Sequence, residues 1–254
     1  ILLPFCPNIR QLSFDFNFKD KRIRKLIILS SSVFISNSAI YICSIIKFII
    51  ASKLPPGNIA ALTYSWSIIL LAHTLVGLTI SVIVYPVFSE FNIKKNTAAV
   101  KNLLDQSITA LIVLLIPVSI FMFEYSNEII SIVFGRGKFN LDSVYITSGA
   151  MAIYSIGLIG YGTKELLTKV FFSLKKTKIV LIAGIIFTCL EIGMSMYIVD
   201  YWGINGIVLS SVIMVMLNSL ILYLLLSKEI GMSFSKKVSA AFLKCLISAA
   251  FMIG

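Results

Sequence analysis

The sequence contains long runs of apolar residues, and these runs constrain its fold more than any other feature. A run of about 20 apolar residues matches the hydrocarbon thickness of a lipid bilayer. In hydrocarbon every backbone N–H and C=O must be paired within the protein, so each run is predicted to be a helix rather than an open strand. We therefore expect an all-α polytopic membrane protein with about seven transmembrane helices. The runs are 26–51, 62–88, 107–123, 144–162, 179–199, 204–226 and one that starts near 240.

The composition excludes the main alternative classes. Hydrophobic residues make up 58% of the 254 positions and charged residues 13%, with a mean hydropathy of +0.98. An ordinary soluble domain is about a quarter charged, and a disordered chain combines low hydrophobicity with high net charge. A transmembrane barrel would show short alternating segments, which this sequence lacks.

Positive charges between the apolar runs gather on alternate loops. One set of loops holds 16 Lys and Arg residues, whereas the other set holds 3. Cytoplasmic loops of membrane proteins carry the excess of Lys and Arg, so the basic set is predicted to be cytoplasmic. The net charge of +11 is interpreted in this way rather than as a sign of nucleic-acid binding. The basic loops hold Lys19, Lys21, Arg22, Arg24, Lys25, Lys94, Lys95, Lys101, Lys164, Lys169, Lys175, Lys176, Lys178, Lys228, Lys236 and Lys237; the other loops hold Lys53, Arg136 and Lys138.

The runs and charges divide the chain into three segments. Residues 1–25 are predicted to hold the end of a preceding span and a cytoplasmic basic loop. Residues 26–226 form a lobe of six helices, and residues 227–254 a cytoplasmic loop with the start of a further span. Because Ile1 is not an initiator Met and the last run stops at Gly254, we expect the sequence to be part of a longer chain.

No pattern typical of an enzyme or a cofactor site is present. The sequence has no phosphate-binding loop and no Ser/His/Asp constellation. Its four cysteines and its single histidine, His73, lack the spacing of metal ligands. We therefore expect no enzymatic activity, no cofactor and no metal, and we interpret His73 as a residue of a helix contact.

Two opposite charges inside predicted spans are the leading candidates for function. Ionisable residues are costly in the membrane, by about 2.5–3.5 kcal/mol at the centre, so they mark functional sites by default. Lys47 lies near the end of the first run and Glu191 in the middle of the fifth. Lys47 either enters a polar cavity or snorkels to the outer interface. If both are buried, pairing between them would remove two isolated charges.

Other polar residues are further candidates for contact with a substrate or an ion. Asn37 and Ser195 lie inside spans, where such side chains also join helices through hydrogen bonds. Arg136 is a cation of an outer loop, and the alternative interpretation is a solvated turn between Gly135 and Gly137. Trp66 is predicted at a span end, where aromatic residues form belts in any case.

Four short motifs follow one another along nearly the whole chain. They are Ala51-Ser52-x-Leu54-Pro55-x-Gly57 with Tyr64; Gly77 through Pro86 and Ser89; Phe134-Gly135-x-Gly137-x-Phe139 with Tyr154 and Gly157; and Phe171-Phe172-Ser173-Leu174. In order and spacing they resemble motifs of the MurJ/MviN family, which are lipid II flippases of the MOP exporter superfamily. The resemblance implies the C-terminal lobe of a two-lobe, fourteen-span transporter.

The resemblance also implies a function. The protein would be a flippase that moves a lipid-linked oligosaccharide outward by alternating access, in the inner membrane of a bacterium. Its partners would be that substrate, membrane lipids and, as a further option, cell-wall synthesis proteins. Two alternatives stay open, namely an exporter of other undecaprenyl-linked sugars or of small cationic compounds, and a scaffold that does not transport.

The sequence departs from the family at positions that bear on the substrate. Ser67 stands where the family has an Arg that is thought to face the head-group cavity, which makes Ser67 a candidate contact. Lys47 stands where relatives often have an acidic residue. The resemblance therefore suggests that the Lys47 ammonium replaces a cation that the relatives take from solution.

Overall fold

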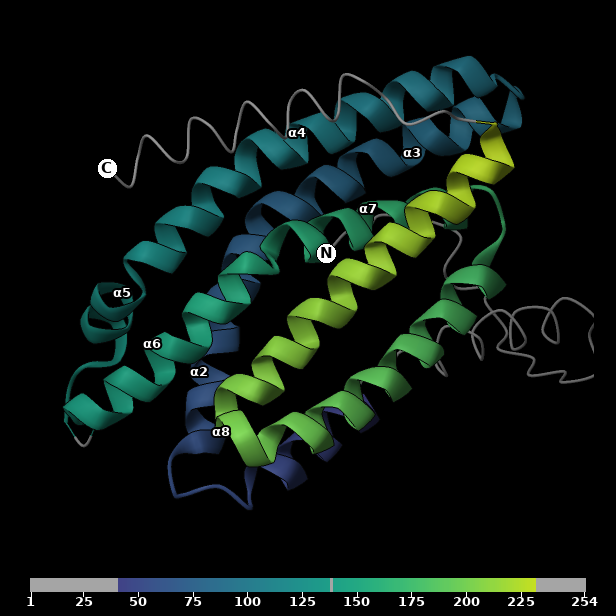
Figure 1. The fold of residues 1–254 in the computed structure, drawn as a ribbon. Coiled ribbons are helices and arrows are strands. Elements are labelled where there is room, and N and C mark those ends of the chain that lie inside the picture. The colour runs from purple at the N-terminus through teal and green to yellow at the C-terminus, as the bar shows by residue number, and fades with distance from the viewer. Residues whose placement is uncertain (1–40, 138, 232–254) are drawn as a thin grey trace, which may run out of the picture. The chain divides into compact units, whose positions relative to one another are not determined.

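A computed structural model describes residues 41–137 and 139–231, and within them it contains helices and no strand (Figure 1), which agrees with the expected all-α class. The predictions for Asn37, Lys138, the loop 19–25 and the last apolar run lie outside these residues. The elements are the helix Tyr41–Ala51, α2 (Asn58–Ala72), the π-helical segment η3 (His73–Leu78), α3 (Thr79–Ile93), α4 (Thr97–Glu124), α5 (Ser126–Phe134), α6 (Leu141–Ile156), α7 (Leu158–Ser173) and α8 (Thr177–Ile230).

The long helices coincide with the predicted spans. The elements α2, η3 and α3 form one helical stretch, Asn58–Ile93, that contains the predicted span 62–88. The helix α4 likewise contains the span 107–123. Among the described residues three stretches are long and apolar enough to cross a membrane, and the bent pair α6–α7 makes a fourth if it counts as one span.

The helical structure at the predicted fourth span continues beyond the predicted end. The sequence places its end at residue 162, but the helical path bends by 47° between α6 and α7 and continues to Ser173. The helix α7 packs against α3, α4 and α8, and the core side chains Leu166, Leu167 and Phe171 have no exposed surface. The segment up to Ser173 is therefore stabilised as a helix by packing against its neighbours, which the apolar run in the sequence does not indicate.

The element α8 is a helical hairpin rather than one straight helix. Gly203 has φ +55° and ψ −135°, a conformation that residues with a Cβ rarely adopt, and Figure 1 shows the two arms of α8 meeting at an apex. Just beyond the apex, a Cβ on Gly206 would lie 2.9 Å from the carbonyl oxygen of Ile198. Two glycines therefore make the short turn that the sequence predicts between the fifth and sixth spans.

The segment η3 crosses α7 at very close range. A Cβ added to Gly77 would lie 3.0 Å from the Cα atom of Gly162. A Cβ on Gly162 would lie 2.5 Å from a methyl carbon of Leu115 on α4. Small residues let membrane helices approach backbone to backbone, so these two glycines fix the distance between η3 and α7.

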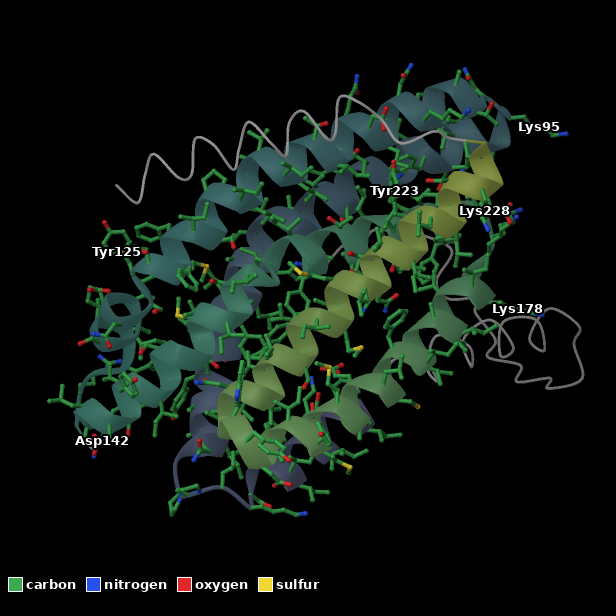
Figure 2. The ribbon with its side chains drawn as sticks, in the orientation of Figure 1. Lys95, Tyr125, Asp142, Lys178, Tyr223 and Lys228 are labelled. Carbon is green, nitrogen blue, oxygen red and sulfur yellow. The ribbon has the colours of Figure 1, made fainter. Side chains whose placement is uncertain are left out.

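The basic loops gather at one end of the helices. Lys101 donates a hydrogen bond to the carbonyl of Gly231 at 2.8 Å, and Lys176 forms an ion pair with Glu229. In Figure 2 the labelled Lys95, Lys178 and Lys228 lie at this end, and Asp142 and Tyr125 lie at the other.

The weakly charged loops gather at the opposite end. A pocket of about 410 Å³ there brings together Pro55, Ser126, Tyr145 and the Gly203 turn. The turn Gly135–Gly137 also lies at this end. It follows the short helix α5, which the sequence analysis did not predict. The alternation of charge along the sequence therefore corresponds to two separate ends of the helical bundle.

Candidate transport cavity

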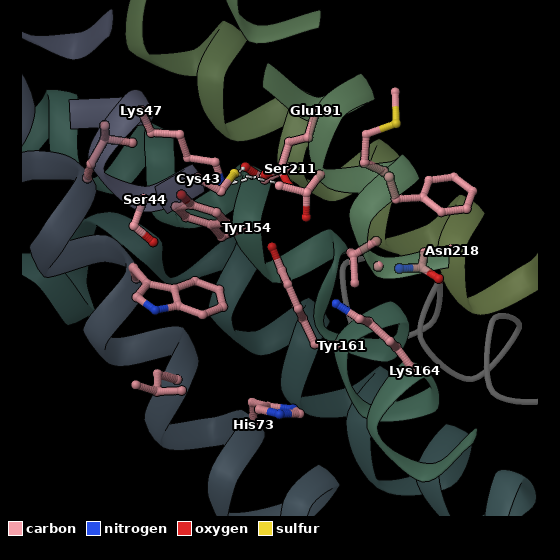
Figure 3. Close-up of a pocket in the computed structure, with 18 of the residues that line it drawn as sticks. Cys43, Ser44, Lys47, His73, Tyr154, Tyr161, Lys164, Glu191, Ser211 and Asn218 are labelled. Atoms are coloured by element: carbon pink, nitrogen blue, oxygen red, sulfur yellow. Dashed lines mark hydrogen bonds and ion pairs between the residues drawn. The ribbon is translucent and has the colours of Figure 1, made fainter. Parts of the chain in front are cut away.

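The described helices line a partly open cavity of about 440 Å³, in which several charged and polar groups converge among apolar side chains. Figure 3 shows its labelled residues pointing toward one another from the helix Tyr41–Ala51, η3, α6, α7 and both arms of α8. Outside the cavity the helices present apolar side chains, such as Leu75, Ile83 and Ile182, each more than half exposed. Charged and hydroxyl groups that converge in such a cavity suit a membrane protein that accommodates a ligand with a polar part.

Lys47 and Glu191 form an ion pair in this cavity, which confirms their predicted proximity. Their side chains are only 20% and 16% exposed. The Lys47 ammonium also donates a hydrogen bond of 2.9 Å to the Ser211 hydroxyl, and the Cys43 thiol lies 3.9 Å from the second Glu191 oxygen. Lys47 thus faces the cavity instead of snorkelling to the interface.

The ion pair and the hydrogen bond of Lys47 together join three helical elements. Lys47 belongs to the helix Tyr41–Ala51, Glu191 to the first arm of α8 and Ser211 to the second arm. The Ser211 hydroxyl also donates to the carbonyl of Ile207 at 3.2 Å, so its oxygen remains available as the acceptor for Lys47. Lys47 therefore links both arms of α8 to the helix Tyr41–Ala51.

An aromatic wall lines another side of the cavity. The Trp66 ring lies 5.4 Å from the ring of Tyr154 and 5.1 Å from that of Tyr161. His73 lies edge-on to Tyr161 with ring centroids 6.3 Å apart, which supports its interpretation as a helix-contact residue. Trp66 belongs to α2, toward the start of the helical stretch Asn58–Ile93, and its predicted place in an aromatic belt at a span end stays a prediction.

Lys164 also lines the cavity, and sequence reasoning missed it. We assigned Lys164 to a cytoplasmic loop because the fourth span was predicted to end at residue 162. The extension of the span through α7 instead holds Lys164 against the cavity, and Figure 3 shows its ammonium pointing inward. Its neighbour Glu165 also lines the cavity and forms an ion pair of 3.3 Å with Lys169, one helical turn further on.

The remaining candidates occupy different places. Ser67 lines the cavity and donates to the carbonyl of Thr63 at 2.7 Å. Ser195 is fully buried outside the cavity lining, and its hydroxyl has no hydrogen-bond partner among the described residues. Arg136 is exposed in the turn after α5 and does not line this cavity. Asn37 lies outside the residues that the structure describes.

A metal site does not emerge from the geometry. Within residues 41–137 and 139–231, no three His, Cys, Asp or Glu side chains are grouped as metal ligands would be. The polar groups that converge on the cavity are instead ammonium, carboxylate, hydroxyl and amide groups, which bind polar organic ligands or ions through hydrogen bonds and charge.

The fold is similar to about half of two solved transporter structures. A solved structure titled "Lipid II flippase MurJ, inward closed conformation" matches with a TM-score of 0.78 and 22% identity, over 94% of this chain and 50% of that one. A MOP-superfamily transporter from Pyrococcus furiosus matches with a TM-score of 0.70 and 14% identity, over 88% of this chain and 51% of that one.

The family model described as "Lipid II flippase MurJ" matches residues 1–254, and the chain belongs to this family. The probable lipid II flippase MurJ of Borreliella burgdorferi is 26% identical over 171 residues, which are 67% of this chain and 34% of the relative. That of Buchnera aphidicola subsp. Schizaphis graminum is 26% identical over 208 residues, which are 82% and 40% of the two chains. The chain thus spans about a third to two fifths of the length of these relatives.

Proposed function

We propose that the protein containing this chain is a flippase for a lipid-linked oligosaccharide of the lipid II type, and that this chain supplies one of its lobes. The observation that carries the proposal is a family match over all 254 residues, combined with a cavity in which charged and polar groups converge inside an apolar bundle. The activity belongs to transport across the inner membrane of a bacterium and involves no bond-making step.

The cavity is suited to the polar head of such a lipid. Its Ser67 hydroxyl, its aromatic wall and its lysines offer hydrogen bonds, stacking surfaces and positive charge to sugars and phosphates. The apolar chain of the lipid would stay outside, against exposed side chains such as Leu75 and Ile83. Alternating access would then expose the cavity first to the cytoplasmic side and afterwards to the outer side.

The charge of the cavity disfavours the export of small cationic compounds. Among the described residues two carboxylates line it, of which Glu191 is paired with Lys47 and Glu165 with Lys169. A cationic ligand would have to compete with an ammonium at either carboxylate, and Lys164 would repel it. An anionic head group meets no such obstacle.

Complementation tests the proposal against the alternative of a scaffold without transport. The full-length gene is expressed in a strain depleted of its own lipid II flippase, and growth is measured together with the amount of protein in the membrane. We expect growth to be restored, and we expect proteoliposomes of the full-length protein to move labelled lipid II between leaflets. Membrane-located protein that restores no growth and moves no lipid would exclude the flippase and favour the scaffold.

A further inference from the structure

The pocket at the weakly charged end of the bundle is separate from the transport cavity, and we call it the apex pocket after the Gly203 apex of α8. Its volume of about 410 Å³ is in the range of pockets that hold small organic ligands. Among the described residues it is framed by the loop before α2, the start of α5, the N-terminal part of α6 and the α8 apex. It shares no described lining residue with the transport cavity, so it needs an explanation of its own.

The polar groups of the apex pocket are uncharged. Its described lining residues include amides and hydroxyls but no Lys, Arg, Asp or Glu. The amide nitrogen of Asn58 donates a hydrogen bond of 2.7 Å to the carbonyl of Pro55, which uses only one of its two N–H groups. An ionic ligand would lose water here without gaining a counter-charge. The lining therefore favours an uncharged polar ligand.

One hydrogen-bond acceptor of the apex pocket lacks a partner. The side-chain oxygen of Asn205 is buried and accepts no hydrogen bond from the described residues. Its amide lies over Gly149 of α6, where an added Cβ would be 3.7 Å from the oxygen and 3.8 Å from the nitrogen. Buried polar atoms are nearly always paired. A ligand that pairs with this oxygen has to supply an O–H or N–H donor.

Two exposed aromatic side chains line the same pocket. Trp202 at the α8 apex is 62% exposed, and Tyr145 on α6 is 79% exposed. Aromatic residues gather at membrane interfaces in any case, and Tyr201, which is 75% exposed but does not line the pocket, represents that role. A sugar ring has an apolar C–H face, which an aromatic ring covers, and a rim of hydroxyl groups, which amides and hydroxyls bind.

We propose that the apex pocket binds an uncharged saccharide. Trp202 and Tyr145 cover the C–H face of a sugar ring, and Asn205 accepts a hydrogen bond from a hydroxyl or an acetamido N–H group. The inference rests on the proposed function, because the charge distribution assigns this end of the bundle to the outer side, where a flippase releases its substrate. The pocket then receives the sugars of the lipid-linked substrate after they leave the transport cavity.

Equilibrium binding to the purified full-length protein tests this assignment. The protein is placed in lipid nanodiscs, because detergents with sugar head groups would compete for the pocket. The probes are a soluble disaccharide of N-acetylglucosamine and a short-chain lipid II analogue. We expect Trp202→Ala and Asn205→Ala each to weaken binding of the disaccharide about 3–10-fold, as for the loss of one aromatic face or one hydrogen bond. The control Tyr201→Ala should leave it unchanged, and Trp202→Phe should retain most of it.

Thermal unfolding of each variant separates misfolding from lost contacts. Asn205→Ala breaks no side-chain hydrogen bond of the Asn205 oxygen, so it should fold as the wild type does. A wild type that does not bind the disaccharide would overturn the assignment, as would equal affinity in the wild type and both pocket variants. An equal loss in Tyr201→Ala would also overturn it, because the effect would then belong to interface aromatic residues in general.

The two probes separate this assignment from the proposed function. Parallel losses for the disaccharide and the lipid II analogue would identify the lipid-linked substrate as the source of the sugar. Trp202-dependent binding of the disaccharide without any binding of the lipid II analogue would support the pocket and refute the proposed function. A protein that restores growth in the complementation experiment but does not bind the disaccharide would refute the pocket and leave the flippase in place.

Discussion

Breaking the Lys47–Glu191 ion pair should destabilise the protein strongly, and removing both partners should restore most of the loss. Lys47→Met leaves the buried Glu191 carboxylate without its ion-pair partner and with the Cys43 thiol, 3.9 Å away, as its remaining hydrogen-bond contact among the described residues. Glu191→Leu leaves the Lys47 ammonium with only the Ser211 hydroxyl, at 2.9 Å. Each single change therefore strands a charge in a site where both side chains are at least four-fifths covered.

The size of the effect follows from that burial. Removing one partner of a buried pair costs about 3–5 kcal/mol, whereas apolar replacement of both partners is often nearly neutral. We therefore expect each single variant to lose about 3–5 kcal/mol and the double variant, Lys47→Met with Glu191→Leu, to lose about 1 kcal/mol or less. The difference between the double loss and the sum of the single losses measures the coupling.

The assay is reversible unfolding of the full-length protein in detergent micelles, measured for all four members of the cycle. The pair Glu90–Lys94 is a matched control, because the same residue types lie 2.6 Å apart but remain more than half exposed. The control cycle should show little coupling. Additive losses at Lys47 and Glu191, within about 0.5 kcal/mol, would refute the reasoning that the pair is energetically buried.

Three further predictions concern the hairpin, the topology and the ion requirement. Gly206→Ala should destabilise the protein by about 1–3 kcal/mol because its Cβ would strike the Ile198 backbone; the control Gly193→Ala meets no atom within 4 Å, so thermal unfolding that does not separate the two would contradict the close packing. In a variant without native cysteines, an impermeant thiol reagent applied from outside should label one set of exposed positions and not the other, and labelling of the second set would invert the topology. The first set is Lys53→Cys and Asp142→Cys, and the second is Lys95→Cys and Lys178→Cys. Finally, since Lys47 already neutralises Glu191, lipid transport in proteoliposomes should keep its rate when the sodium gradient is abolished, and a large loss of rate would show that a solution cation is still required.

The ion pair could be predicted from the sequence because the alternatives were few. A lysine and a glutamate isolated in separate apolar runs have strong physical reasons to meet. The span order was predictable for a similar reason, since a bilayer requires runs of a certain length. Both predictions follow from the length and composition of single segments and from the cost of placing a charge among apolar residues.

Features that depend on packing between helices could not be predicted in this way. Lys164 follows an apparent span end, and only the burial of α7 against α3, α4 and α8 keeps it within the bundle. The π-helical segment that begins at His73 lies where Gly77 approaches Gly162, a contact between residues 85 positions apart.

The Lys47 ammonium has a mechanical consequence for the α8 hairpin. Glu191 and Ser211 lie on opposite arms, about 18 Å and 12 Å from the Gly203 apex by helical rise. Because one ammonium binds both arms at once, the arms cannot swing apart without breaking a buried charge contact. Conformational change during a transport cycle should therefore carry the hairpin and the helix Tyr41–Ala51 as a single rigid body, with the hinges located in elements that this contact does not join.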